Sequence, residues 1–289
     1  MDGRRGLVGV LVVLAVAGAG LAAWLGSGAS GTSTAARSTT STGPRPPVTL
    51  RVIFPEGFTR GEMAARIGAV RAIAIRKRHV RPRLTAASYL AASVAARAPR
   101  GFARHPGSRS LEGFLFPATY DFTQATTARE LVADQLAAFR KAFSTVDLRY
   151  ARSKNLTRYD VLTIASMIEK EAVVPSERRL VAAVIYNRLH LRMPLGIDTT
   201  IRYGLDVPGT KSLTKTELAS SNPYNTRRFR GLPPTPIANP GLPSIRAAAH
   251  PARVDYLYYV RKPDKRHHFF TASGREFLRK ACEYGYGCS

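Results

Sequence analysis

The sequence predicts a mixed α+β fold that follows an N-terminal transmembrane helix, and three observations lead to this prediction. An uncharged apolar run occupies residues 7–25. After residue 48, short alternating stretches typical of strands and longer amphipathic stretches typical of helices follow one another in mixed order. The 289 residues are enough for one large domain or two small ones once the N-terminal tail is set aside.

The N-terminal segment predicts the compartment. Arg4 and Arg5 precede the apolar run, whose roughly 19 residues span a bilayer core at a rise of about 1.5 Å per residue. A cleaved signal peptide is the alternative, but its apolar region would be shorter, and Trp24 resembles an interfacial anchor. We therefore expect residues 1–25 to be a cytoplasmic tip and an uncleaved transmembrane helix of a single-pass protein, with the rest of the chain outside the cell membrane.

A linker and a small module follow the predicted anchor. Residues 26–47 are rich in Ser, Thr, Gly and Ala and end in Pro-Arg-Pro-Pro, which predicts a disordered linker. The folded region should begin with a strand over residues 48–54, after which Thr59 and the glutamate three residues later open a helix. With a second helix over residues 85–97, these elements predict a binding module of residues 48–110, too small to bury much core independently.

Residues 111–289 are predicted to form a larger mixed α+β domain. Its aromatic-rich start is interrupted by Pro117, which excludes a long helix and favours a strand and turn over residues 111–122. Thr157, with an aspartate three residues later, should open a central helix that runs to about Val174. The rest is rich in proline and is expected to be mostly loop. The other elements expected are helices over residues 127–143 and from Ser176 onward, and strands over residues 256–260 and 268–271.

The charge and the cysteines limit the choice of partners. A formal net charge of +25 indicates an anionic partner, namely nucleic acid, anionic lipid or an acidic cell-wall polymer, although a solvated basic surface is the plainer interpretation. No Cys/His finger, RNA-binding aromatic signature or zipper accompanies the charge, so we do not expect nucleic-acid binding. Cys282 and Cys288 permit a disulfide that their spacing alone leaves open, and without a histidine pair they make no zinc set. We expect no metal and no cofactor.

The stretch that carries most chemical information is Ala-Ser-Met-Ile-Glu-Lys-Glu-Ala, residues 165–172. A carboxyl group at the C-terminal end of a helix meets the negative end of the helix dipole, which disfavours its ionised form, as a general acid requires. On a helical wheel, Glu169 and Glu171 lie about 80° to either side of the buried stripe, so the pattern leaves the choice open and the helix end slightly favours Glu171. Surface carboxylates paired with Arg178 or Arg179 are the alternative.

These motifs resemble those of the endolytic murein transglycosylases of the YceG-like (MltG) family. The resemblance runs from about Val48 to Thr271, with the motifs in the same order and at similar spacing. The motifs that carry it are the stretch above, Leu-Glu-Gly-Phe-Leu-Phe-Pro-Ala-Thr-Tyr, Val-Ile-Tyr-Asn-Arg-Leu, Met-Pro-Leu-Gly-Ile-Asp-Thr-Thr, Tyr-Asn-Thr, Gly-Leu-Pro-Pro-Thr-Pro-Ile-Ala-Asn-Pro-Gly, Ala-Ala-Ala-His-Pro-Ala and Tyr-Leu-Tyr-Tyr-Val.

The resemblance implies endolytic cleavage of the MurNAc–GlcNAc β-1,4 bond in peptidoglycan, leaving 1,6-anhydro-MurNAc ends. It places the catalytic role on the second glutamate of the triplet, Glu171. Most glycosidases use two carboxylates, but a lytic transglycosylase needs no attacking water, because the muramyl 6-hydroxyl closes on the anomeric carbon. One carboxyl can therefore protonate the leaving oxygen and then accept the 6-hydroxyl proton.

The resemblance also implies a substrate groove. Polar groups that can bond sugar hydroxyls and acetamides, and rings that can stack on sugars, recur in its motifs. Structural roles are the alternative: a helix cap or an Asx-turn for the asparagines and a salt bridge to an arginine for the aspartate. The residues expected to bind substrate are Tyr186, Asn187, Asp198, Tyr224 and Asn225.

The expected partners are peptidoglycan glycan strands, the cell membrane and, by resemblance, penicillin-binding proteins or other wall-synthesis enzymes. The protein would terminate the elongation of nascent strands, and residues 48–110 resemble a LysM-like module through their opening strand and helices. Two rivals stay open. A catalytically weak glycan-binding scaffold would tolerate loss of Glu171, whereas a hydrolase would need a second carboxylate, such as Asp198, about 5–10 Å from Glu171.

Overall fold

The structure, a computed structural model, describes residues 47–102 and 110–286. The predicted membrane segment, the linker up to residue 46 and Cys288 lie outside the described residues, so the transmembrane helix and the disulfide stay predictions. In the part of the chain that is described, no helix has the length and apolar character needed to cross a bilayer.

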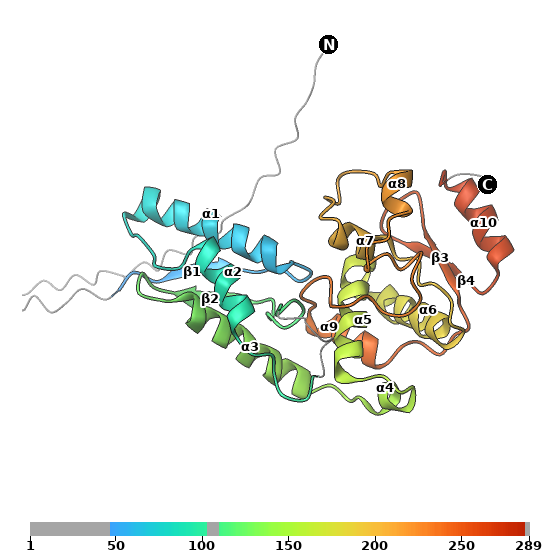
Figure 1. The fold of residues 1–289 in the computed structure, drawn as a ribbon, viewed down its shortest axis with the longest axis horizontal. Coiled ribbons are helices and arrows are strands. Elements are labelled where there is room, and N and C mark those ends of the chain that lie inside the picture. The colour runs from blue at the N-terminus through green and yellow to red at the C-terminus, as the bar shows by residue number, and fades with distance from the viewer. Residues whose placement is uncertain (1–46, 103–109, 287–289) are drawn as a thin grey trace, which may run out of the picture. The chain divides into compact units, whose positions relative to one another are not determined.

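The N-terminal elements form a two-stranded sheet covered by helices (Figure 1). The first strand pairs antiparallel with the second, Leu50 opposite Phe122 and Ile53 opposite Thr119. Leu50 and Val52 point into the core while the residues between them are exposed, so the predicted alternation is confirmed. The elements are β1 (Leu50–Ile53), α1 (Arg60–Arg78), α2 (Ala86–Ala95), β2 (Thr119–Phe122) and α3 (Ala128–Ser144).

Helix starts follow the sequence closely, because threonine caps define them. Capping boxes begin α1, α2 and α3, at Thr59, Thr85 and Thr127. In each box the threonine side chain accepts a hydrogen bond from the backbone three residues later, and that residue's side chain accepts one in return. The three helices therefore begin within a residue of their predicted positions.

The C-terminal elements surround one central helix, α5 (Figure 1). A capping box at Thr157 opens this helix, and it packs against α6, α7 and α9. Strands β3 and β4 pair antiparallel, with Tyr258 opposite Thr271 and Arg261 opposite His268. The elements are α4 (Arg149–Ser153), α5 (Arg158–Glu171), η1 (Pro175–Glu177), α6 (Arg178–His190), α7 (Asp198–Gly204), α8 (Lys215–Leu218), α9 (Leu242–Ala249), β3 (Tyr258–Arg261), β4 (His268–Thr271) and α10 (Gly274–Glu283).

Two details differ from the expectation. The central helix ends at Glu171 and not near Val174, because Ala172 already has an extended backbone, three residues before Pro175. The region expected to be mostly loop contains α7, α8 and α9, of 7, 4 and 8 residues. Helices this short hold one or two turns, which is too little for an apolar period to be recognised.

A buried polar cluster, Glu112 with Asn239, joins the two groups of elements. The Glu112 carboxylate accepts hydrogen bonds from the Arg60 backbone at 3.0 Å, from Asn239 Nδ2 at 2.7 Å and from the Tyr203 hydroxyl at 3.2 Å. Asn239 Oδ1 in turn accepts from the backbone amides of Gly113 and Leu115, both at 2.9 Å. Together with the β1–β2 pairing, these bonds cross the proposed boundary at residue 110.

Glu112 should make the stability of the fold depend on pH. Burial, opposed by the hydrogen bonds it accepts, raises the pKa of Glu112 from 4.5 to about 7. The folded state then binds more protons than the unfolded state between these two values. The free energy of unfolding should therefore fall as pH rises from about 4.5 to about 7, by up to about 3 kcal/mol.

Urea denaturation at several pH values in this window measures the slope. The Glu112→Gln variant should lack it, because the amide does not titrate. An equal slope in the variant would assign the pH dependence to another group.

Candidate active site

Glu171 is the last residue of α5, and its carboxylate is held between two hydroxyl groups from other elements. The Thr199 hydroxyl, in the first turn of α7, donates to Oε1 at 2.7 Å. The Tyr259 hydroxyl, on β3, donates to Oε2 at 3.1 Å. Glu171 is 8% exposed, so three separate segments meet at one nearly buried carboxylate.

The surroundings of Tyr259 keep it a hydrogen-bond donor. Burial, with the neighbouring Glu171 charge, raises the pKa of Tyr259 well above its ordinary value, so the phenol keeps its proton. Its ring meets the His268 ring edge-on, at 5.3 Å between centroids. His268 is fixed by Glu177, which accepts from its backbone amide at 2.9 Å and lies 2.7 Å from its Nδ1. A second buried pair therefore supports the side chain that contacts Glu171.

Glu169 has a different environment from Glu171. Its Oε2 accepts a hydrogen bond from the backbone amide of Gly241, the residue that caps α9, at 2.9 Å. Its Oε1 lies 4.0 Å from Arg178 Nη2, and both side chains are largely buried. The pairing with Arg178 that the sequence left open is thus present for Glu169. One glutamate contacts a backbone amide and a guanidinium, which are donors only, while the other faces two hydroxyls.

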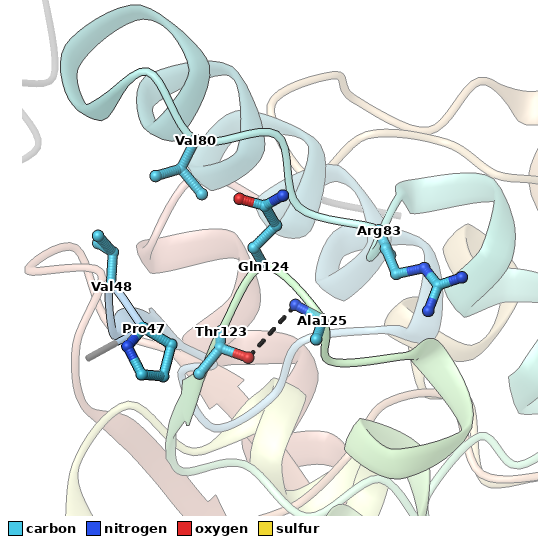
Figure 2. A pocket seen from close by; sticks show the side chains of 7 residues that line it. All are labelled: Pro47, Val48, Val80, Arg83, Thr123, Gln124 and Ala125. Atoms are coloured by element: carbon cyan, nitrogen blue, oxygen red, sulfur yellow. Dashed lines mark hydrogen bonds between the residues drawn. The ribbon is translucent and has the colours of Figure 1, made fainter. Parts of the chain in front are cut away.

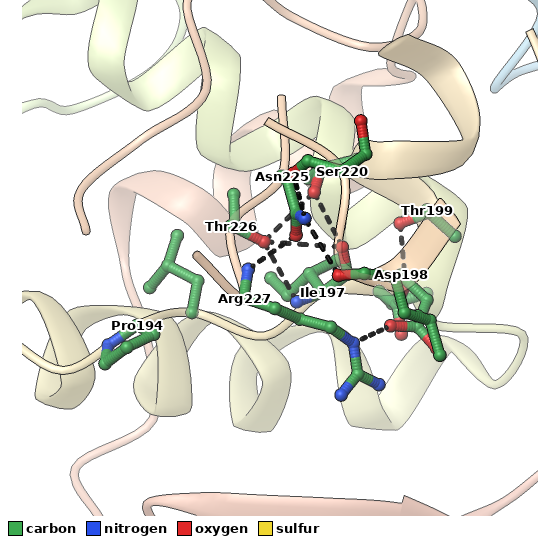
Figure 3. Close-up of polar contacts among 12 residues, drawn as sticks. Pro194, Ile197, Asp198, Thr199, Ser220, Asn225, Thr226 and Arg227 are labelled. Atoms are coloured by element: carbon green, nitrogen blue, oxygen red, sulfur yellow. Dashed lines mark hydrogen bonds and ion pairs between the residues drawn. The ribbon is translucent and has the colours of Figure 1, made fainter. Parts of the chain in front are cut away.

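Asp198 is partly exposed and forms an ion pair. Arg227 Nε lies 2.6 Å from Asp198 Oδ1, and both side chains are nearly half exposed. The hydroxyl of Thr226 accepts from the Ile197 amide at 3.0 Å and so ties the segment before Arg227 to the start of α7 (Figure 3). The salt bridge to an arginine, which was the structural alternative for Asp198, is therefore present, next to Thr199.

The side chains of the two α6 residues predicted to bind substrate donate hydrogen bonds to backbone carbonyls of this chain. The Tyr186 hydroxyl donates to the Ala248 carbonyl at 2.7 Å. Asn187 Nδ2 donates to the carbonyls of Val254 and Tyr256, both at 2.9 Å, and thereby holds the segment that leads into β3. These contacts position β3 and its Tyr259, while direct substrate binding by the pair stays a prediction.

The other two residues predicted to bind substrate, Tyr224 and Asn225, lie just before Arg227, the ion-pair partner of Asp198, in the sequence. The Tyr224 hydroxyl lies 2.7 Å from the Thr235 hydroxyl. Asn225 is fully buried, its amide bonds two carbonyls, and its Oδ1 accepts from the Arg227 amide at 3.1 Å, which is the Asx-turn given as an alternative (Figure 3). Their binding role also stays a prediction, and their visible role is to shape this loop.

Thr199 and Tyr259 are the contacts of Glu171 that the sequence analysis missed. Both stand in motifs that carry the family resemblance, Thr199 directly after Asp198 and Tyr259 within the aromatic strand. The sequence signal for Thr199 was its place directly after a candidate site residue. For Tyr259 the sequence was not decisive, because a strand alternates its faces and Tyr258 could equally have been the inward residue.

Two surface pockets lie away from Glu171. One, of about 420 Å³, lies between the start of β1, the α1–α2 connection and the end of β2, and Figure 2 shows its lining side chains, Val80, Arg83 and Gln124 among them. The other, of about 730 Å³, is lined by residues that include Arg178, Arg179 and His250. Neither lining includes Glu171. Within residues 47–102 and 110–286, no group of three or more His, Cys, Asp and Glu side chains could hold a metal ion.

Comparison with known proteins places these features in one family. The sequence profile of the YceG-like family matches residues 29–283. Relatives described as endolytic murein transglycosylase are 35% identical over 236 residues in Streptococcus pneumoniae (strain ATCC BAA-255 / R6) and 38% identical over 159 residues in Bacillus subtilis (strain 168). These matches cover 75% and 55% of this chain, respectively.

The chain covers only 41% and 43% of those two relatives, so it spans about two-fifths of their length. A crystal structure of a yceG-like protein from Listeria monocytogenes superposes with a TM-score of 0.66 at 27% identity. That match covers 80% of this chain and 76% of the other. The mixed α+β fold is therefore that of a YceG-like protein.

The two glutamates should respond differently to the same substitution. Glu171→Gln should change the free energy of unfolding by less than about 0.5 kcal/mol, because a hydroxyl can rotate to accept from the new amide. Glu169→Gln should lower it by about 1–2 kcal/mol, because it removes the charge that faces the buried Arg178 guanidinium. Denaturant unfolding of both variants measures this, and equal losses would contradict the distinction.

Proposed function

This chain belongs to the YceG-like family, and we propose that it is an endolytic lytic transglycosylase of peptidoglycan. The substrate is the glycan strand, the bond cut is the MurNAc–GlcNAc β-1,4 bond, and the product carries a 1,6-anhydro-MurNAc end. The activity named for the relatives supports the reaction class. One observation assigns the proposed reaction to a residue: Glu171 is a nearly buried carboxylate whose hydrogen-bond partners, Thr199 and Tyr259, are both rotatable hydroxyls.

One carboxyl performs both proton transfers. Protonated Glu171 gives its proton to the glycosidic oxygen as the bond from that oxygen to the anomeric carbon of MurNAc breaks. The resulting carboxylate then takes the proton of the muramyl 6-hydroxyl, whose oxygen bonds the anomeric carbon. The acid is regenerated and no water is consumed, so atoms and charge balance.

Thr199 and Tyr259 orient this carboxyl. When Glu171 is ionised, both hydroxyls donate to it and stabilise the charge that forms during the first step. When Glu171 is protonated, the rotatable threonine hydroxyl can accept in place of donating. Asp198, the second carboxylate that a hydrolase would need, is paired with Arg227, and the single-carboxylate mechanism does not require it.

The same proposal includes the setting of the enzyme. We place residues 1–25 as a cytoplasmic tip and single membrane-spanning helix, residues 26–47 as a disordered tether, residues 48–110 as a LysM-like module and residues 111–289 as the catalytic domain. This arrangement would hold the site close to nascent strands and close to penicillin-binding proteins or other wall-synthesis enzymes. The apolar run at residues 7–25 supports the anchor.

Replacing the proposed acid should abolish the chemistry. Glu171→Gln keeps the shape of the side chain but removes its titratable proton, so release of anhydro-muropeptides should fall by at least about a hundredfold. Glu169→Gln, the matched control two residues away, should retain activity. Mass spectrometry of digested glycan strands gives the answer.

Three outcomes of that digestion would count against the proposal. Reducing ends in place of anhydro ends would identify a hydrolase. Activity lost in Glu169→Gln and kept in Glu171→Gln would assign the wrong carboxylate. A wild-type protein that binds strands without cutting them would favour the glycan-binding scaffold.

Tyr259→Phe should lower kcat by about tenfold or more while KM stays near the wild-type value. The phenylalanine ring keeps the packing against His268, and only the hydroxyl that orients Glu171 is lost. Steady-state kinetics on one defined glycan substrate separates the two constants. A rise in KM alone would assign Tyr259 to substrate binding.

A further inference from the structure

A basic, partly aromatic segment leaves the site beside Asp198 and has no described partner of opposite charge. It consists of Arg228, Phe229 and Arg230, and we name these three residues the basic lip. All three are exposed, and Phe229 is 42% exposed. Among the described residues, neither arginine forms an ion pair with a carboxylate.

Hydrogen bonds and an ion pair connect the basic lip to the proposed catalytic centre. The residue before it, Arg227, pairs with Asp198 at 2.6 Å, and the residue after Asp198 bonds Glu171 at 2.7 Å (Figure 3). Buried Asn225 accepts from the backbone amides of Arg228 and Phe229 through its own carbonyl, at 3.0 and 2.9 Å. The start of the lip is therefore anchored, although its side chains reach solvent.

The side chains of the lip are arranged to receive an anionic and partly apolar ligand. The Arg228 guanidinium lies over the Phe229 ring, 5.9 Å from its centroid, and its Nη1 makes a long 3.4 Å contact with the Ala219 carbonyl. A guanidinium presents five N–H donors in a fork that matches a carboxylate. In the sequence an arginine stands on each side of this exposed ring, a composition that suits a chain with carboxylates and small apolar groups.

We propose that the basic lip binds the carboxylates of the peptide stems on the glycan strand. The inference rests on the proposed function, which makes the glycan strand the substrate. The strand itself carries mostly neutral sugars, whereas its peptide stems end in and contain free carboxylates. The enzyme then prefers strands whose stem carboxylates are free over strands whose stem carboxylates have been converted to amides.

The test compares two substrates of equal length distribution, namely strands with free stem carboxylates and the same strands after these carboxylates have been converted to amides. Wild-type protein should cut the strands with free carboxylates with a kcat/KM about three- to tenfold higher, as expected for two exposed ion pairs. The double variant Arg228→Gln/Arg230→Gln should bring this ratio close to one, mainly through KM. Arg228→Lys/Arg230→Lys should keep part of the preference, and added salt should reduce it.

The control is Arg129→Gln/Arg140→Gln, which removes two exposed charges from α3 and should leave the ratio unchanged. A ratio near one in the wild type, or an unchanged ratio in the lip variant, would overturn the proposal.

A binding arm separates this proposal from the enzymatic one. Fluorescence anisotropy with labelled, stem-bearing fragments and the Glu171→Gln protein should show weaker binding when the lip arginines are replaced. If the wild type cuts neither substrate but binding still depends on the lip, the proposed function fails and the lip stands. If binding is also independent of the lip, the inference is overturned.

Discussion

The buried contact between Glu112 and Asn239 is the constraint on which the rest of the site depends. Glu112 accepts from the hydroxyl of Tyr203, which lies on the same short helix as Thr199. Asn239 stands two residues before Gly241, whose amide binds Glu169. Every donor in this cluster meets an acceptor, and a buried polar group left unpaired would cost about 1–3 kcal/mol. The cluster therefore sets where α7 and the start of α9 meet the end of α5.

The end of α5 carries the carboxyl group that we propose as the catalytic acid. Two glutamates separated by one residue diverge around the helix, and the structure uses them for opposite purposes. Glu169 is bound to donor-only groups and secures the packing of α9, whereas Glu171 faces hydroxyls that can both donate and accept. A carboxyl that must alternate between protonated and ionised forms is served better by the second environment, because neither form leaves a buried donor stranded.

Part of the excess positive charge of the chain is concentrated near the same site. Most of the charge is spread over exposed helices and is adequately explained as a solvated surface. Near Asp198, however, three of the four residues 227–230 are arginines, and one of them, Arg227, forms an ion pair with that aspartate. Under the proposal, a carboxylate-rich polymer bound at Glu171 contacts the other two arginines. Charge at this position can direct the choice of strand without taking part in the bond cleavage.

The sequence by itself determined the elements whose signals are local. Threonine caps with their reciprocal partners defined the starts of the main helices, alternation defined β1, and the two candidate glutamates were visible at a helix end. It also carried the family motifs, and with them the reaction that we propose. Only the tertiary structure decided which glutamate faces Thr199 and Tyr259, and that Tyr186, Asn187, Tyr224 and Asn225 bond the chain itself. The reason is physical: the partners of Glu171 come from segments 28 and 88 residues away. The apolar period of a helix does not show which of its two flanks such distant segments will contact.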